Sequence, residues 1–152
     1  MHPSLATLFG DAEVTVTVLT RTGIISTQSC DLAVRASGKA HASEVLFCPV
    51  YSQAELANHG FFSKKTAWEE ARKGRLPAYG VLNRCELAGQ ERDFQLVDFS
   101  RVFTVDIMLV RELAGRHGSR LRLYPPYREH LAQAFARFFM RVGLPVDVPP
   151  FR

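Results

Sequence analysis

Reactive side chains are concentrated in a short polar stretch that follows an apolar segment near the start of the chain. Gln28, Ser29, Cys30 and Asp31 supply an amide, a hydroxyl, a thiol and a carboxylate at consecutive positions. A thiol where a strand meets a turn is a nucleophile when neighbouring amides lower its pKa, although the adjacent Asp31 opposes thiolate formation. The alternative is that Cys30 is a buried structural residue and that Asp31 stabilises the turn by binding backbone amides.

Arg21 and Ser52 are candidates for chemistry on a phosphate group. Cleavage of RNA requires a cation beside the phosphorus and an acceptor for the proton of the 2′-hydroxyl. Arg21 would supply the cation, because a guanidinium keeps its charge and binds two oxygens at once. Ser52 or Asp31 would orient or accept the proton. The competing interpretation is that Arg21 is a surface charge at a strand end and that Ser52, three residues before Glu55, caps a helix.

The composition is that of one folded domain spanning residues 1–152. Hydrophobic residues make up 47% of the chain and charged residues 22%, and the net charge of +4 permits binding to nucleic acid without requiring it. No apolar run approaches the roughly 20 residues that span a bilayer, and the first residues lack the pattern of a secretion signal. We therefore expect a bacterial protein of the cytoplasm that does not associate with a membrane.

The cysteines and histidines do not have the spacing of a cross-linked or metal-bound protein. Cys30, Cys48 and Cys85 form no C-x-x-C pair, and the five histidines stand apart. We expect no disulfide framework, no metal and no cofactor. Cys48 lies inside an apolar segment and is expected to be a small core residue.

The densest positive cluster surrounds the single tryptophan of the chain. Lys64, Lys65, Arg72 and Lys73 lie within a few positions of Trp68 on a predicted helix. Such a cluster can stack a base on the indole ring and hold the backbone of RNA with the cations. The alternative is that Trp68 packs on the domain while the charged residues face the solvent.

Hydrophobic periodicity predicts short strands and a few helices. Alternating or continuous apolar residues indicate strands over 14–20, 24–25, 44–50, 79–82, 94–98, 101–105 and 121–124. Capping residues and glycines indicate a short helix starting at Ser52, a second between Ser63 and Gly74, and a third between Asp106 and Gly115. The segment 33–43 is expected to be an exposed loop.

The C-terminal region predicts an amphipathic helix over about 127–142. An apolar stripe at helical spacing contains Leu131, Ala134, Phe135, Phe138 and Phe139. One interpretation is a helix that packs on the core of its own domain. The other is a surface for a partner protein, a second copy of the chain or a phosphate backbone.

Several segments resemble the PemK/MazF group of bacterial toxins, whose SH3-like barrels cleave RNA without a metal. Arg21 precedes the strand residues 23–26, and 45–52 resembles the second strand of that group, which ends in Pro-x-Thr or Pro-x-Ser. Residues 89–105 resemble its pair of strands around an Asp-Gln turn. The turn at 28–31 is similar to one in uncharacterised bacterial proteins. The resemblance covers 14–105 discontinuously.

Two departures from the PemK/MazF pattern concern the site. Thr22 stands where that group has the proline of Arg-Pro, and Tyr51 occupies the threonine position, with Ser52 one residue later. The helical segment 52–73 and the C-terminal helix are additions. The resemblance implies an α+β protein with a strongly curved antiparallel barrel over about 14–124.

These observations lead to two functional hypotheses. The first is a nucleic-acid-associated protein of toxin-like ancestry, an endoribonuclease using Arg21, Ser52 and Asp31. The second is a non-catalytic interaction module of a bacterial defence or toxin–antitoxin system. An enzyme built on the thiol of Cys30 is a third alternative.

Overall fold

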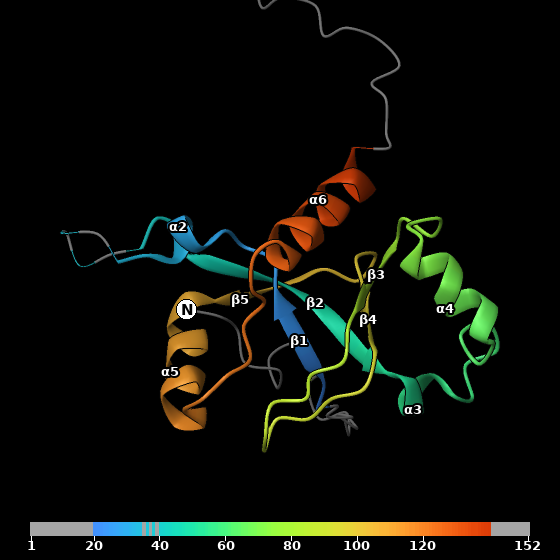
Figure 1. Cartoon of the computed structure of the whole chain (residues 1–152). Helices are drawn as coiled ribbons and strands as arrows, with labels where there is room; N and C mark the ends of the chain where they lie inside the picture. Colours follow the sequence, from blue (N-terminus) through green and yellow to red (C-terminus); the bar gives the residue numbers. More distant parts are fainter. Residues whose placement is uncertain (1–19, 35, 37, 39, 141–152) are drawn as a thin grey trace, which may run out of the picture.

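The computed structural model describes residues 20–34, 36, 38 and 40–140. They form an α+β fold in which a five-stranded antiparallel sheet carries helices along its length (Figure 1). In chain order the elements are β1 (Thr22–Ile25), α2 (Ser29–Leu32), β2 (Glu44–Ser52), α3 (Gln53–Leu56), α4 (Lys65–Arg72), β3 (Tyr79–Leu82), β4 (Gln95–Asp98), β5 (Phe103–Asp106), α5 (Ile107–His117) and α6 (Tyr127–Phe139).

The long strand β2 pairs with three other strands. Along one edge it pairs with β1, in a register that places Thr22 opposite Val50. Along the other edge it pairs with β5 through residues 44–47 and with β4 through residues 50–52. β4 pairs in turn with β3. The branched apolar residues of β2 favour this central position, because they pack well on a sheet that is covered on both faces.

A bulged segment separates β4 from β5 along the edge of β2. Cys48 and Pro49 of β2 lie opposite residues 98–102, which cannot all pair with them. The buried carboxylate of Asp98 stabilises this turn by accepting hydrogen bonds from the Ser100 amide at 2.9 Å and the Ser100 hydroxyl at 2.5 Å. The interruption predicted between residues 98 and 101 is therefore confirmed.

The two faces of the sheet carry separate hydrophobic clusters. Leu96 faces α3 and α4, where it packs with Leu56, Phe62, Ala67 and Ala71. Its neighbour Val97 points to the opposite face, as successive strand residues must. There it packs with Cys48, Val50 and Phe99 beneath the apolar stripe of α6, namely Leu131, Ala134, Phe135 and Phe138. The core-packing interpretation of the C-terminal helix is confirmed for these four side chains.

The described part of the sheet is open, so the closed SH3-like barrel is not confirmed. The strand predicted at 14–20 lies almost entirely outside the described residues, and so does the end of the C-terminal helix after residue 140. No helix in the described ranges is long and apolar enough to cross a membrane.

Three local predictions are wrong. Residues 121–124 form no strand, because no sheet edge in the described structure pairs with them. Helix α5 continues past Gly115 to His117 and ends before Gly118, whose φ of 61° is a conformation that favours glycine. Ser63 does not cap α4, because its hydroxyl donates to the Gly60 carbonyl instead.

Gly80 of β3 tests how closely α6 packs on the sheet. A Cβ atom at this position would lie 2.8 Å from Cζ of Phe99 and 3.1 Å from Cδ1 of Leu131. We expect Gly80→Ala to lower the free energy of unfolding by about 1–3 kcal/mol, because the ring and the helix must shift. Urea denaturation measures the change. Gly60→Ala is the matched control, since nothing lies within 4 Å of its Cβ position; an equal effect of both substitutions would contradict the close packing.

Candidate functional site

Arg21, Tyr51, Ser52 and Glu55 form one group, here called the Arg21 cluster, at the end of β2. The pairing of Thr22 with Val50 places Arg21, the preceding residue, beside Tyr51. The Arg21 guanidinium carbon lies 5.2 Å from the centroid of the Tyr51 ring. Its Nη1 atom lies 3.6 Å from Oε1 of Glu55. The structure thus brings together two of the predicted site residues, Arg21 and Ser52.

The Glu55 carboxylate is held in place by Ser52. The backbone amide and the hydroxyl of Ser52 both donate to Oε2 of Glu55, at 2.7 and 2.8 Å. The Glu55 amide lies 3.2 Å from the Ser52 hydroxyl oxygen, which completes the predicted capping box of α3. One carboxylate oxygen is therefore engaged by Ser52, and the other faces Arg21.

The hydrogen bonds from Ser52 also set the charge of the cluster. The backbone and hydroxyl donors of Ser52 lower the pKa of Glu55, and the positive charge of Arg21 lowers it further. Glu55 is thus ionised at neutral pH. The Arg21 and Glu55 side chains remain 44% and 46% exposed, so solvent screens their attraction and both can contact a ligand. The cluster offers a fixed cation, a proton acceptor and an aromatic ring.

Asp31 lies away from this cluster. Its carbonyl accepts hydrogen bonds from the amides of His41 and Ala42, which precede the first residue of β2. Ser52 ends that nine-residue strand, and a strand of this length extends over roughly 26 Å. The structure therefore does not bring Asp31 together with Arg21 and Ser52.

The cysteines occupy three different environments. Cys30 is exposed on the single turn α2, so the alternative of a buried structural residue is wrong, and its Sγ donates to Oε1 of Gln28 at 3.6 Å. Cys48 is a fully buried core residue, as predicted. Burial raises the pKa of the Cys48 thiol and so disfavours its reactive thiolate. Cys85 is partly buried in the loop between β3 and β4.

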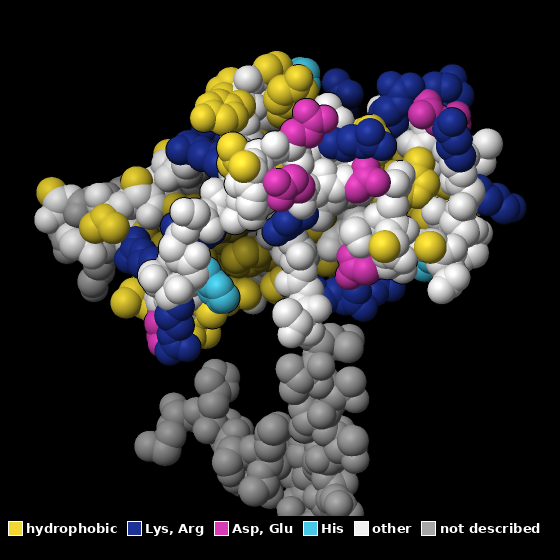
Figure 2. All heavy atoms as spheres, turned by 60° about the horizontal axis from the view of Figure 1, so that its bottom comes forward, with side chains coloured by type: hydrophobic (Ala, Val, Ile, Leu, Met, Phe, Trp, Pro, Cys, Tyr) yellow, Lys and Arg dark blue, Asp and Glu magenta, His cyan; other side chains and the backbone are white. Residues whose placement is uncertain are grey.

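The predicted basic cluster lies on and around α4. Lys and Arg side chains gather over this helix, on the right of Figure 2. Trp68 is half-buried against the core, and its indole N–H donates to the Phe62 carbonyl at 2.8 Å. Arg72 pairs with Glu69 at 2.8 Å. Trp68 therefore does pack on the domain, as the alternative interpretation held. Lys64 and Lys65 lie at the start of α4 and Lys73 lies at its end.

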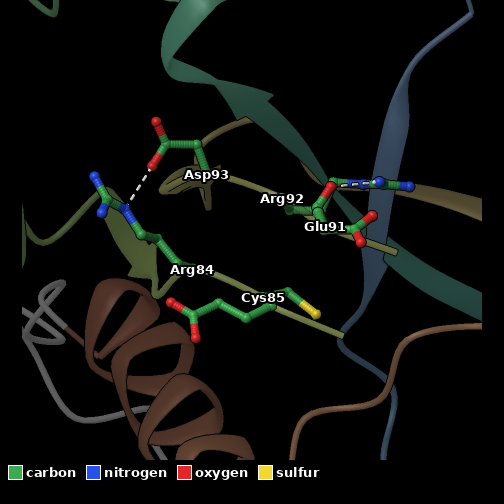
Figure 3. Close-up of a pocket in the computed structure, with 6 residues that line it drawn as sticks. Arg84, Cys85, Glu91, Arg92 and Asp93 are labelled. Atoms are coloured by element: carbon green, nitrogen blue, oxygen red, sulfur yellow. Dashed lines mark hydrogen bonds and ion pairs between the residues drawn. The ribbon is translucent and has the colours of Figure 1, made fainter. Parts of the chain in front are cut away.

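A hollow of about 390 Å³ lies on the hairpin between β3 and β4 (Figure 3). The Arg84 and Asp93 side chains close an ion pair there at 2.9 Å, and the Arg84 guanidinium lies 4.8 Å from the Phe94 ring centroid. Three acidic side chains, of Glu86, Glu91 and Asp93, and two arginines line this hollow, so it carries no strong positive charge for a phosphate. Sequence analysis selected none of these residues.

Glu55 and Tyr51 are the members of the Arg21 cluster that sequence analysis did not assign to the site. The sequence places Glu55 only in the capping box. It marks Tyr51 only as a departure from the PemK/MazF pattern. The spacing of Ser52 and Glu55 was the available signal. The contact with Arg21 depends on the pairing of β1 with β2, which the sequence does not specify.

Comparison of the chain with protein-family models, curated proteins and solved structures found no significant match. Within the ranges that the structure describes, no group of three or more His, Cys, Asp and Glu side chains could hold a metal ion.

The hydroxyl of Ser52 lowers the pKa of Glu55 more than the charge of Arg21 does, and Ser52→Ala removes this hydroxyl while it keeps the backbone donor. We expect Ser52→Ala to raise the pKa of Glu55 more than Arg21→Ala does, measured by titrating the carboxyl carbon by NMR. Because the folded-state pKa lies below the unfolded value, the stabilisation from Glu55 is present above the unfolded pKa and is lost as the pH falls through the folded one. A larger shift in Arg21→Ala would contradict this order.

Proposed function

We propose that this chain binds single-stranded RNA and cleaves it at the Arg21 cluster, without a metal in the reaction. The observation that carries the proposal is the contact of Arg21 with a carboxylate that Ser52 holds in place. A cation and a proton acceptor are the two groups that RNA cleavage through the 2′-hydroxyl requires. Both are partly exposed at the end of the sheet, where an RNA strand can reach them.

The proposed reaction is an internal transfer at phosphorus. The Glu55 carboxylate takes the proton from the 2′-hydroxyl, and the 2′-oxygen forms a bond to the adjacent phosphorus. The bond from phosphorus to the 5′-oxygen breaks, and that oxygen takes a proton from water. The hydroxide left behind takes the proton held by Glu55, which restores the carboxylate and the water. Arg21 neutralises the charge that builds up on the phosphoryl oxygens. Ser52 is a positioning residue that aims the carboxylate, and the Tyr51 ring supports the guanidinium.

The proposal also covers the fold and the toxin-like function that the resemblance to the PemK/MazF toxins implies. In it, the open sheet is part of a strongly curved SH3-like barrel. The chain would then be a toxin-like ribonuclease of the bacterial cytoplasm. Support comes from the order of Arg21, β1, a loop and β2, since that order brings the arginine beside the strand end.

A second candidate is an interaction module that binds a partner protein through α6. Phe135 and Phe138 pack on the core, and the Phe135 ring meets Phe99 at 5.8 Å, so they are unavailable to a partner. Phe139 and Met140 are instead 52% and 79% exposed at the end of α6. Exposed apolar residues at one helix end favour a contact with another chain.

The cleavage proposal predicts a strong dependence on Arg21. Wild-type protein incubated with mixed single-stranded RNA in EDTA should release fragments, and Arg21→Ala should lower the rate by about 100-fold or more, because one transition-state contact is lost. Gel electrophoresis of labelled RNA gives the rates.

Arg116→Ala is the matched control, because Arg116 is also exposed and paired with a glutamate, Glu112 on α5. Its cleavage rate should equal that of the wild type. Circular dichroism should show the same fold for both variants. Absence of cleavage by the wild type, or equal rates in the wild type and Arg21→Ala, would overturn the proposal and favour the interaction module.

A further inference from the structure

A hollow of about 280 Å³, here called the Trp68 pocket, adjoins the Arg21 cluster. Its lining comes from the start of α3, the loop after it and the first turns of α4, and consists of Gln53, Phe62, Ser63, Lys65 and Trp68. Gln53 directly follows Ser52, the residue that holds Glu55. A ligand in this pocket therefore lies next to the proposed site of cleavage.

The floor of the pocket is formed by aromatic rings that are fixed in place. Phe62 is only 4% exposed, and its ring meets that of Trp68 at 6.1 Å in a T-shaped arrangement. The hydrogen bond from the indole N–H to the Phe62 carbonyl holds the Trp68 ring. The indole therefore needs no further polar partner, and its half-buried ring surface is free to contact a flat, apolar group.

Polar side chains at the rim of the pocket can form hydrogen bonds with the edge of a flat ligand. The exposed amide of Gln53 can both donate and accept hydrogen bonds. The Ser63 hydroxyl donates to the Gly60 carbonyl at 3.1 Å, which leaves its oxygen able to accept. An aromatic floor with a few polar groups at the rim is the usual composition of a small-molecule pocket.

The surroundings of the pocket are positively charged. Lys65 lines it, and Lys64 immediately precedes α4. The nearby Glu69 carboxylate is neutralised by its 2.8 Å contact with Arg72. A ligand that combines a flat ring with a negative charge fits this arrangement, and a nucleotide has both.

We propose that the Trp68 pocket receives a base of single-stranded RNA. The base packs against Trp68 and forms hydrogen bonds with Gln53, while Lys65 contacts a phosphate of the same strand. This inference rests on the proposed ribonuclease function, and it makes Gln53 and Lys65 the residues that position the strand over the Arg21 cluster.

Trp68 is itself the probe for this proposal, because it is the single tryptophan of the chain. Full-length protein is titrated with a 2′-O-methyl oligonucleotide, which lacks the attacking hydroxyl and is not cleaved. Stacking of a base should quench the tryptophan fluorescence to saturation. Anisotropy of a fluorophore on the oligonucleotide reports binding anywhere on the protein.

Two substitutions test the contacts. Gln53→Ala should weaken the affinity about fivefold, the effect of one lost hydrogen bond. Lys65→Gln should weaken it roughly threefold to tenfold and reduce the slope of log affinity against log salt concentration by about one. Gln133→Ala and Arg137→Gln, at exposed positions of α6, remove one side-chain amide and one positive charge elsewhere and should change neither quantity.

The outcomes separate this inference from the ribonuclease proposal. Binding seen by anisotropy without quenching would overturn the pocket and leave the ribonuclease proposal standing. Quenching that Gln53→Ala and Lys65→Gln leave unchanged would also overturn the pocket. No binding by either measurement would overturn both.

Discussion

The pairing of β1 with β2 is the constraint on which the rest of this structure depends. It places Thr22 opposite Val50, and so fixes Arg21 beside Tyr51 and within reach of Glu55. A slip of one residue would turn the side chains of β1 to the opposite faces of the sheet. The same strand β2 carries β4 and β5 on its other edge, so its position also determines how the two hydrophobic clusters form.

The end of β2 joins the core to the candidate site. Val50 is buried beneath α6, whereas Tyr51, the next residue, points to the face covered by α3 and α4. Ser52 then ends the strand and caps α3 in one step. Because the backbone of Ser52 is part of the sheet and its side chain holds Glu55, the carboxylate of the site is fixed to the central strand of the sheet.

Local signals in the sequence were enough for most elements and for one part of the site. The strand at 79–82, the cap by Asp106 and the capping box of Ser52 and Glu55 all depend on neighbouring residues, and all are confirmed. Residues 121–124 alternate like a strand but pair with no strand of the described sheet. Periodicity shows which residues can form a strand and does not show whether a partner exists.

The contacts of the site depend on long-range pairing, which the sequence does not specify. Arg21 and Glu55 meet only because β1 and β2 align. Asp31 was grouped with Arg21 and Ser52 on the chemistry of its carboxylate alone, which does not show where that carboxylate lies. The sequence left open whether Cys30 is exposed or buried, since burial depends on the tertiary position of α2 and not on the residue type. Closure of the sheet into a barrel stays a prediction.

The chemical identity of the cleavage products tests the central claim most directly. A defined oligoribonucleotide is incubated with the protein in EDTA, and the fragments are analysed by mass spectrometry. Attack by the 2′-hydroxyl predicts one fragment ending in a 2′,3′-cyclic phosphate and another beginning with a 5′-hydroxyl. Fragments that carry a 5′-phosphate, or cleavage on the 3′ side of a 2′-deoxy nucleotide, would contradict a reaction driven by Glu55 and Arg21.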